Sequence, residues 1–354
     1  MTRYRLSLLD KSPLASGDEA PDALKRTIAL AQAAERLGYH RFWVAEHHNA
    51  PELASSAPEV LIAFLLANTA RIRIGSGGVM LQHYSAYKVA EVFNLLASLA
   101  PGRVDLGIGK APGGLPLATR ALQGAHDPAR KPGFAEQLDD LGRFLDGPVA
   151  AGETLAGLSA TPRPPVTPER FLLGASVESA ELAATRGWQF VFARHLNGDD
   201  VLLADAVAAY RSKAGRPPLV AVAAIVADSA AEAARQAAGL QLFKVHVPGA
   251  QSVTVGSEAQ AKDYARQAGA SEYRVERKAP SVLAGTAADV LAALDRLHER
   301  HGIGEFIVEP AVKGAARLAL VEQLAQAHGV TEHGVTARRS PAAQQPALRQ
   351  VIPA

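Results

Sequence analysis

The chain has 354 residues, of which 48% are apolar and 5% aromatic, and it contains no cysteine. The lack of cysteine excludes disulfides, thiolate metal ligands, iron–sulfur clusters and a cysteine nucleophile, and a balance of 37 basic against 35 acidic side chains argues against a partner such as nucleic acid or a membrane surface. The first 20 residues contain Asp10, Lys11, Asp18 and Glu19 and no apolar signal core, and no apolar run reaches the ~18 residues of a membrane span. We therefore expect a soluble, cytoplasmic protein.

A short apolar run followed by a longer helical stretch recurs along the chain. In chain order, we expect a strand over 4–9 and a helix from Pro21 that ends before Gly38, then a strand over 41–45 and a helix over 58–70. A strand over 72–81, a helix over 86–99 and a strand over 104–109 follow. The second half continues with strands over 171–174, 190–193, 219–226 and 305–308, each followed by a helix, over 176–185, 199–214, 229–240 and 313–328.

Several of these strands, such as 219–226, are continuous apolar runs, which indicates a parallel sheet covered on both faces. Eight such units predict a (β/α)8 TIM barrel, with a doubly wound open sheet as the alternative. Insertions follow strand four (110–170, with a helix near 134–145) and strand seven (241–285, with helical pieces around 258–267). We expect one domain over 1–330 and a mobile polar tail over 331–354.

Two histidines follow strands at the same spacing, since His47 and His195 each come two residues after the last alanine of a strand. Catalytic groups of such barrels lie at the carboxyl ends of the strands, and a neutral imidazole exchanges protons near pH 7. Adjacent residues of an extended chain point to opposite sides, so only one of His47 and His48 is expected to face the pocket. Coincidence among 11 histidines is the alternative.

These histidines also allow other interpretations. Either residue of the pair could cap the next helix or bind loop carbonyls. A metal-dependent hydrolase built on His47, His48 and His195 is a further alternative, with Glu46 or His83 as other candidate ligands. The chain has no HExxH motif and no Cys/His spacing, so we expect no metal site.

Glycines interrupt the third strand at positions 75, 77 and 78. Glycine weakens a strand and often marks the close approach of another group to the backbone. The Gly77-Gly78 pair would expose a flat peptide face at the barrel mouth, which suits a planar ring. A bulge at a barrel corner is the alternative.

Two features point to a phosphate group. Lys110 lies in the run GIGKAPGG after strand four, which matches neither GxGxxG nor the Walker spacing but places a cation beside glycines. Ser176 and Ser179 open the helix after strand five, where free N–H groups bind anions, although ordinary capping is the alternative. A planar ring site and a phosphate site together predict a flavin mononucleotide (FMN) pocket.

The sequence resembles the bacterial luciferase-like monooxygenase family over about residues 4–329. The resemblance rests on eight segments in order and spacing: SLLDKSP (7–13), AEHH (45–48), SAPEVL (56–61), IGSGGVML (74–81), KVAE (88–91), PGRVDLGIGKAPG (101–113), LLGAS (172–176) and VLAGT (282–286). No single segment is decisive, but the series covers most of the chain.

This resemblance implies a barrel with a non-covalent flavin at its mouth. Typical members take reduced FMN from a separate reductase, and oxygen forms a C4a-peroxyflavin that oxidises a small organic substrate. Other members use the deazaflavin F420 as a hydride carrier, and a few bind flavin without known catalysis. Members are often dimers, so a homodimer is expected. The two long insertions are then candidate lids over the mouth.

The resemblance also assigns expected roles to individual residues of the site. His47 matches the catalytic histidine of the luciferases, and Gly77-Gly78 occupy the place of a cis, non-prolyl peptide behind the flavin ring. Ser176 and Ser179 match hydroxyls that hold the flavin phosphate.

Two positions depart from the luciferase pattern. Lys110 stands where the luciferases place a phosphate-binding arginine, and it keeps the charge but lacks the bidentate fork, so weaker phosphate binding is expected. Gly109 stands where they carry a reactive cysteine, so light emission from a long-chain aldehyde does not follow.

Overall fold

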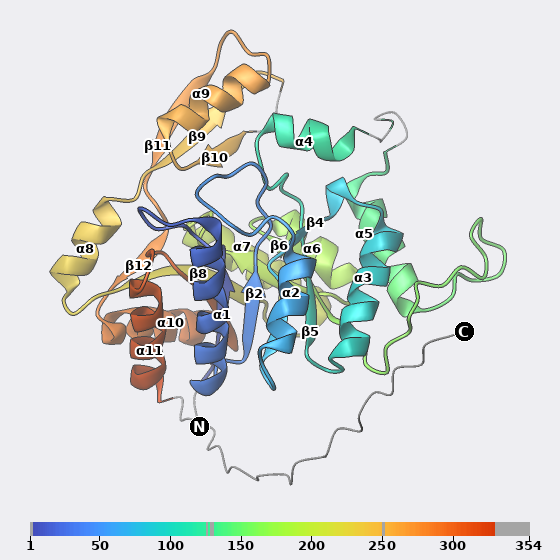
Figure 1. The fold of residues 1–354 in the computed structure, drawn as a ribbon, viewed down its shortest axis with the longest axis horizontal. Coiled ribbons are helices and arrows are strands. Elements are labelled where there is room, and N and C mark those ends of the chain that lie inside the picture. Colours follow the sequence, from blue (N-terminus) through green and yellow to red (C-terminus); the bar gives the residue numbers. More distant parts are fainter. Residues whose placement is uncertain (1–2, 125–126, 128–130, 250–251, 330–354) are drawn as a thin grey trace, which may run out of the picture.

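The computed structural model describes residues 3–124, 127, 131–249 and 252–329, and the tail expected over 331–354 lies outside these residues. Eight parallel strands form a barrel, which closes because β8 pairs with both β7 and β13 (Figure 1). They are β1 (Arg5–Asp10), β2 (Arg41–Val44), β3 (Arg73–Ser76), β5 (Val104–Gly109), β6 (Glu169–Gly174), β7 (Gln189–Ala193), β8 (Leu219–Val226) and β13 (Glu305–Pro310). The predicted barrel is confirmed, and the open sheet is excluded.

Helices surround the barrel. They are α1 (Ala20–Arg36), α2 (Pro58–Ala67), α3 (Ala86–Leu99), α5 (Phe134–Asp146), α6 (Val177–Thr185), α7 (Asp200–Ala214), α8 (Ala230–Ala238), α10 (Ala287–His301) and α11 (Ala316–His328). Local sequence fixes their ends. Thr286 and Asp289 form a capping box at the start of α10, and Gly302 ends it in the left-handed region with φ of 68°. No helix in the described ranges is long and apolar enough to cross a membrane.

The third strand is shorter than the single strand predicted over 72–81. β3 ends at Ser76, a cis peptide joins Gly77 to Gly78, and the two-residue strand β4 (Val79–Met80) and a 3-10 turn (Leu81–His83) follow. Gly107 of β5 allows the backbones of β3 and β5 to approach closely. A Cβ atom at this position would lie only 2.1 Å from the Ser76 carbonyl oxygen. The run therefore kinks at the barrel mouth.

The two insertions were predicted in the right places, but the sheet in the second was missed. The first holds α4 (Pro116–Gln123) and α5. The second holds α9 (Glu258–Gln267), with strands β9 (Leu242–His246), β10 (Val253–Val255), β11 (Arg274–Lys278) and β12 (Val282–Gly285). β9 to β11 form an antiparallel sheet against which α9 packs. β12 pairs with the end of β8.

The two insertions meet beyond the carboxyl ends of the strands, where α4 and α9 lie at the top of Figure 1. The Gln267 side chain of α9 accepts a hydrogen bond from the backbone N–H of Leu117 at 3.0 Å, and its carbonyl accepts one from Arg120 at 3.0 Å. The segments predicted to be lids thus touch each other above the barrel.

Inside the barrel, every second residue of a strand points inward, so the side chains form layers. The middle layer is apolar, with Leu9, Trp43, Phe171, Val191 and Ile307 in one buried cluster. This layer separates a charged layer at the amino ends of the strands from the mouth at their carboxyl ends.

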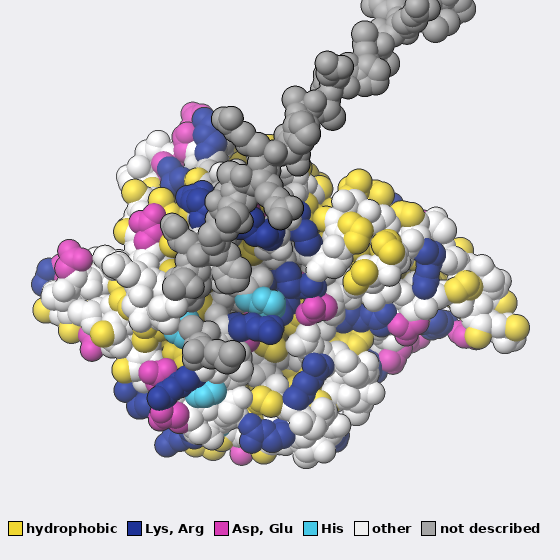
Figure 2. All heavy atoms as spheres, turned by 90° about the horizontal axis from the view of Figure 1, so that it is seen from below, with side chains coloured by type: hydrophobic (Ala, Val, Ile, Leu, Met, Phe, Trp, Pro, Cys, Tyr) yellow, Lys and Arg dark blue, Asp and Glu magenta, His cyan; other side chains and the backbone are white. Residues whose placement is uncertain are grey.

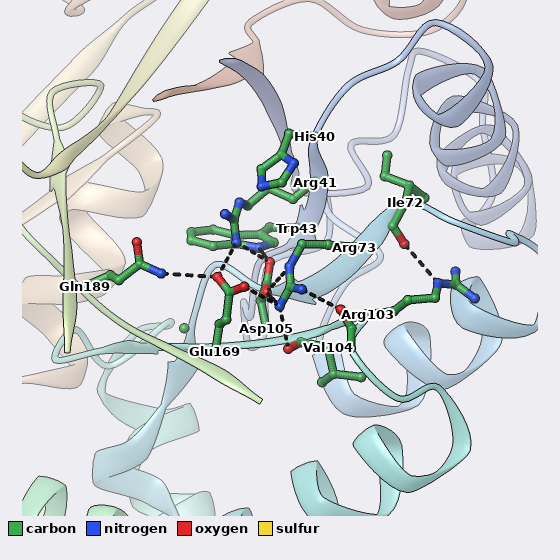
Figure 3. A network of polar contacts seen from close by, with 12 residues as sticks. His40, Arg41, Trp43, Ile72, Arg73, Arg103, Val104, Asp105, Glu169 and Gln189 are labelled. Carbon is green, nitrogen blue, oxygen red and sulfur yellow. Dashed lines mark hydrogen bonds and ion pairs between the residues drawn. The ribbon is translucent and has the colours of Figure 1, made fainter. Parts of the chain in front are cut away.

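The charged layer lies at the amino ends of the strands, and Figure 3 shows Arg41, Arg73, Asp105 and Glu169 in contact there. Arg41 Nη1 lies 2.8 Å from Asp105 Oδ2, and Arg41 Nε lies 2.6 Å from Glu305 Oε1. Arg73 binds the other Asp105 oxygen at 2.6 Å and Glu169 at 3.1 Å. We call these five residues the floor network. Figure 2 views this end of the molecule and shows Lys and Arg side chains gathered over it.

Candidate functional site

The side chains of Glu46 and His48, which follow β2, bind each other. Glu46 is fully buried, and its Oε1 accepts a hydrogen bond from the Tyr84 hydroxyl at 2.8 Å and lies 2.7 Å from His48 Nε2. Its Oε2 accepts from the backbone N–H of Met80 at 3.0 Å. His48 is thus turned away from the barrel axis and secured in the surrounding loops. As predicted, adjacent His47 and His48 take different environments.

His47 belongs to the barrel interior. Its electrostatic neighbours are Lys11 after β1, Glu309 in β13, His48, and His195 after β7. The register explains this meeting, because β1 lies between β13 and β2 in the sheet, so the residues at their carboxyl ends share one edge of the barrel. The predicted equivalence of His47 and His195 is therefore spatial as well as sequential.

The four residues Lys11, His47, His195 and Glu309 form what we call the mouth cluster. Lys11 Nζ lies 2.6 Å from Glu309 Oε1, and both side chains are mostly buried. His195 is tied to β8, since its backbone N–H donates to the Ala221 carbonyl at 3.2 Å. The Nδ1 atoms of both His47 and His195 are buried without a hydrogen-bond partner in the structure. The mouth cluster thus holds two buried imidazole nitrogens whose hydrogen-bonding capacity is unused in the structure.

Burial controls the charge of these imidazoles. Desolvation, followed by the positive charge of Lys11, lowers the pKa of His47 to about 4, and the Glu309 carboxylate opposes this shift. Burial likewise lowers the pKa of His195, again opposed first by Glu309. Burial raises the pKa of Glu309, but Lys11 and the histidines outweigh it, and the pKa stays below its ordinary value. At neutral pH the cluster therefore holds an ion pair and two neutral imidazoles.

Small residues line the barrel wall around this cluster. Ala45 belongs to the interior cluster, and Gly77 faces it, since a Cβ on Gly77 would lie 2.7 Å from Leu9 Cδ1. A Cβ on Gly109 would lie 2.9 Å from Met80 Cε. The cis peptide that the resemblance implied between Gly77 and Gly78 is present. Glycine at these positions therefore lets neighbouring side chains pack directly against the backbone of the wall.

The predicted phosphate-binding residues lie on adjacent strands. Gly109 of β5 pairs with Leu173 of β6, so Lys110 comes beside the start of α6. Lys110 is exposed. Ser176 caps α6, because its hydroxyl oxygen accepts from the Ser179 N–H at 3.2 Å, and the two hydroxyls lie 3.2 Å apart. The capping role is thus established, and the phosphate role stays a prediction.

The loop after β5 is anchored beside this wall. His83 Nε2 lies 2.8 Å from the Pro112 carbonyl oxygen, and its Nδ1 lies 2.9 Å from the Gln123 side-chain nitrogen. His83 therefore holds the loop rather than joining His47. In the described part of the chain, no three His, Asp or Glu side chains are grouped to hold a metal ion.

Sequence reasoning identified His47, His195 and the glycines but missed the importance of Glu46, Lys11 and Glu309. In the sequence, Lys11 stands out only as one charge of the first 20 residues and as part of the segment SLLDKSP. A signal was available, because counting every second residue from Leu9 places Lys11 inside the barrel, and the same count from Ile307 places Glu309 there.

These features define the class as a (β/α)8 barrel with a polar cluster and a glycine-rich wall, which contains a cis Gly77-Gly78 peptide, at the carboxyl ends of its strands. The sequence profile of the family described as luciferase-like monooxygenase matches residues 4–304. The chain belongs to this family.

Individual relatives agree. The chain is 43% identical over 327 residues to the N-acetyl-S-alkylcysteine monooxygenase of Bacillus subtilis (strain 168), covering 90% of this chain and 96% of that protein. Among solved structures, the oxygenating constituent of the 3,6-diketocamphane monooxygenase of Pseudomonas putida, in complex with FMN, superimposes with a TM-score of 0.63 at 18% identity, covering 94% of this chain and 98% of that one.

An F420-dependent secondary alcohol dehydrogenase, in complex with an F420-acetone adduct, superimposes with a TM-score of 0.65 at 16% identity, covering 92% of this chain and 98% of that one. At these identities the two structures share the fold only. The fold therefore accommodates either cofactor.

Proposed function

We propose that the protein is a flavin-dependent monooxygenase that uses reduced FMN and molecular oxygen to oxidise a small organic substrate. The observation that carries this proposal is the neutral imidazole of His47 at the barrel mouth, whose buried Nδ1 has no hydrogen-bond partner in the structure. Family membership and the near full-length match to a monooxygenase support it.

The residues present fit FMN. The peptide between Gly77 and Gly78 has no side chain to obstruct a ring stacked on it. Lys110 supplies a cation, and the hydroxyls of Ser176 and Ser179 with the N-terminus of α6 supply donors for a phosphate. When bound, reduced FMN would supply the electrons that activate oxygen. An F420-dependent enzyme would use the same barrel, and no polar contact among the described residues favours F420 over FMN.

The chain itself would control protons and water. The His47 imidazole is uncharged at neutral pH because its pKa is low, so one of its ring nitrogens can accept a proton. The contact between α4 and α9 covers the mouth and limits access of water to a reacting oxygen species.

For the substrate we propose an N-acylated S-alkylcysteine, in which the thioether sulfur receives the oxygen atom. The support is the 43% identity to an enzyme of that name over 96% of its length. The proposal also implies a separate flavin reductase as partner, and we place both proteins in the cytoplasm.

The test has two stages. The protein is first titrated anaerobically with reduced FMN and, separately, with F420. The FMN complex is then mixed with 18O2 and N-acetyl-S-methylcysteine or N-acetyl-S-butylcysteine, and products are analysed by mass spectrometry. We expect tight binding of reduced FMN and one 18O atom in the product.

Three results would contradict the proposal. Binding of F420 without reduced FMN would establish the hydride-transfer alternative. Tight binding of oxidised FMN with no substrate oxidised would indicate a flavin-binding protein. Turnover of other organic compounds but neither thioether would retain the monooxygenase and reject the substrate class.

A further inference from the structure

The Lys11–Glu309 ion pair has no role in the function proposed above, yet it occupies the centre of the mouth cluster. Lys11 follows β1 and Glu309 lies in β13, two strands that pair in parallel from Arg5 and Glu305 onward. The Nζ–Oε1 distance of 2.6 Å is that of a charge-assisted hydrogen bond. Such a pair, mostly removed from solvent, carries a desolvation cost that a wall of apolar side chains would avoid.

The strand register places the Lys11–Glu309 pair near both His47 and His195. Glu309 pairs in register with Ala223 of β8, two residues from Ala221, whose carbonyl holds the His195 backbone. Since β13 and β7 flank β8, Glu309 and His195 lie on opposite edges of β8 near its carboxyl end. On the other flank, β1 pairs with β2, which carries His47 just beyond its end. The ion pair thus lies between the two imidazoles.

The two charges act on the imidazoles with opposite sign. Lys11 disfavours the protonated form of His47 and of His195, whereas Glu309 favours it. The other titratable neighbour of His47 is His48, which is bound to Glu46 on the far side of the backbone. Lys11 therefore offsets the Glu309 carboxylate, which alone would favour the charged form of both imidazoles, and burial acts in the same direction as Lys11.

We propose that Lys11 is a positioning residue that, through its ion pair with Glu309, keeps His47 and His195 neutral, so that each imidazole can accept a proton at the barrel mouth. The catalytic meaning of this arrangement rests on the proposed monooxygenase function, but the electrostatic arrangement itself does not.

Two single substitutions separate this role from a structural one. Lys11→Met removes the positive charge and leaves the Glu309 carboxylate, so the pKa of His47 rises from about 4 by roughly one to three units. Glu309→Gln removes the negative charge and leaves Lys11, so the pKa falls further. The double variant returns toward the original value. A pair that served only packing would give the same effect in both single variants.

The measurement is a pH titration of the flavin-free full chain with 15N-labelled histidine, which reports the protonation of each ring by NMR. His47 and His195 are assigned with His47→Gln and His195→Gln. Between pH 5 and 8 we expect a protonation step in Lys11→Met and none in Glu309→Gln or Lys11→Arg. Lys88→Met, which removes an exposed lysine of α3, is the control for net charge and should match the unmodified chain.

Shifts in the same direction in both single variants, or no shift in Lys11→Met, would overturn the proposal. Lys11→Gln provides the same test if Lys11→Met does not fold. In turnover assays, Lys11→Met should lose activity at pH 6 and regain it at pH 9. A titration shift without any turnover in the unmodified chain would instead reject the monooxygenase and leave the charge-setting pair standing.

Discussion

Arg41 and Asp105 form a fully buried ion pair on the axis of the barrel, with Nη1 and Oδ2 2.8 Å apart. Arg41 also stacks over the ring of Phe171 at 4.8 Å, and the Trp43 indole N–H donates to Asp105 at 2.9 Å. Neighbouring carboxylates raise the pKa of Arg41 even though its burial opposes this. The pair thus connects the floor network to the apolar layer above it.

The first prediction concerns this pair. Arg41→Met leaves Asp105 and Glu305 buried without their cation, and we expect a loss of about 3–5 kcal/mol in unfolding free energy, measured by urea titration. Arg143→Met, which breaks the half-exposed pair with Glu153, should cost about 1 kcal/mol or less. Equal losses in the two variants would show that the floor network is not a major source of stability.

His47 is the subject of the second prediction. His47→Ala removes the proton acceptor at the mouth, and we expect turnover to fall by roughly 10²–10⁴ while affinity for reduced FMN changes little. His40→Ala removes an imidazole that contacts Arg5 at the other end of the barrel and serves as the control. Unchanged product yield in His47→Ala would exclude this residue from the mechanism.

The third prediction concerns phosphate recognition. Lys110→Ala should weaken FMN binding about tenfold or more and leave riboflavin binding nearly unchanged, because only FMN carries the phosphate. Fluorescence titration with both flavins measures the difference, and Lys88→Ala on α3 is the surface control. A similar loss for both flavins would place Lys110 elsewhere than at the phosphate.

The low pKa of His47 also predicts an acid sensitivity of the fold. In the unfolded chain the imidazole titrates near 6.5, and in the folded chain near 4, so the unfolded state binds the proton more tightly. Its stabilising contribution is present above about pH 6.5 and is lost as the pH falls toward 4, by up to about 3 kcal/mol. His47→Asn should therefore flatten the dependence of the urea midpoint on pH over this range, and parallel curves would refute the assignment.

A homodimer, which the family resemblance suggested, remains a proposal with a defined surface. Val60 and Phe64 on α2 are 66% and 55% exposed, and Leu95 and Leu99 on the adjoining α3 are 50% and 70% exposed. Each pair is four residues apart and so shares one helix face. Phe64→Glu should convert a dimer to a monomer in light scattering, whereas Leu196→Glu, elsewhere on the surface, should not. A monomeric unmodified chain would exclude the dimer.

The barrel was predictable because its signal is local and repeated. Continuous runs such as that of β8 identify buried strands wherever they occur. The small antiparallel sheet lacked this signal, since β11 reads RVERK and is mostly exposed. The glycines did mark an interruption of the third strand, but composition alone does not show that it separates into β3 and β4 after Ser76.

The site, like the fold, has one part that could be predicted from the sequence and one that could not. His47 and His195 could be found because each follows a recognisable strand end. The pairing of Lys11 with Glu309 spans nearly the whole chain and arises only when β13 closes the barrel against β1. A charged residue near a strand end has many solvent-exposed explanations, and only the closed sheet selects the buried one.

The floor network also determines by which end of the barrel a ligand can enter and leave. With one end of the barrel sealed by salt-bridged side chains, a molecule held inside must arrive and depart through the other end, beneath α4 and α9. Cofactor, oxygen and substrate would then share a single entrance. The ligand that binds deepest would have to bind first and dissociate last.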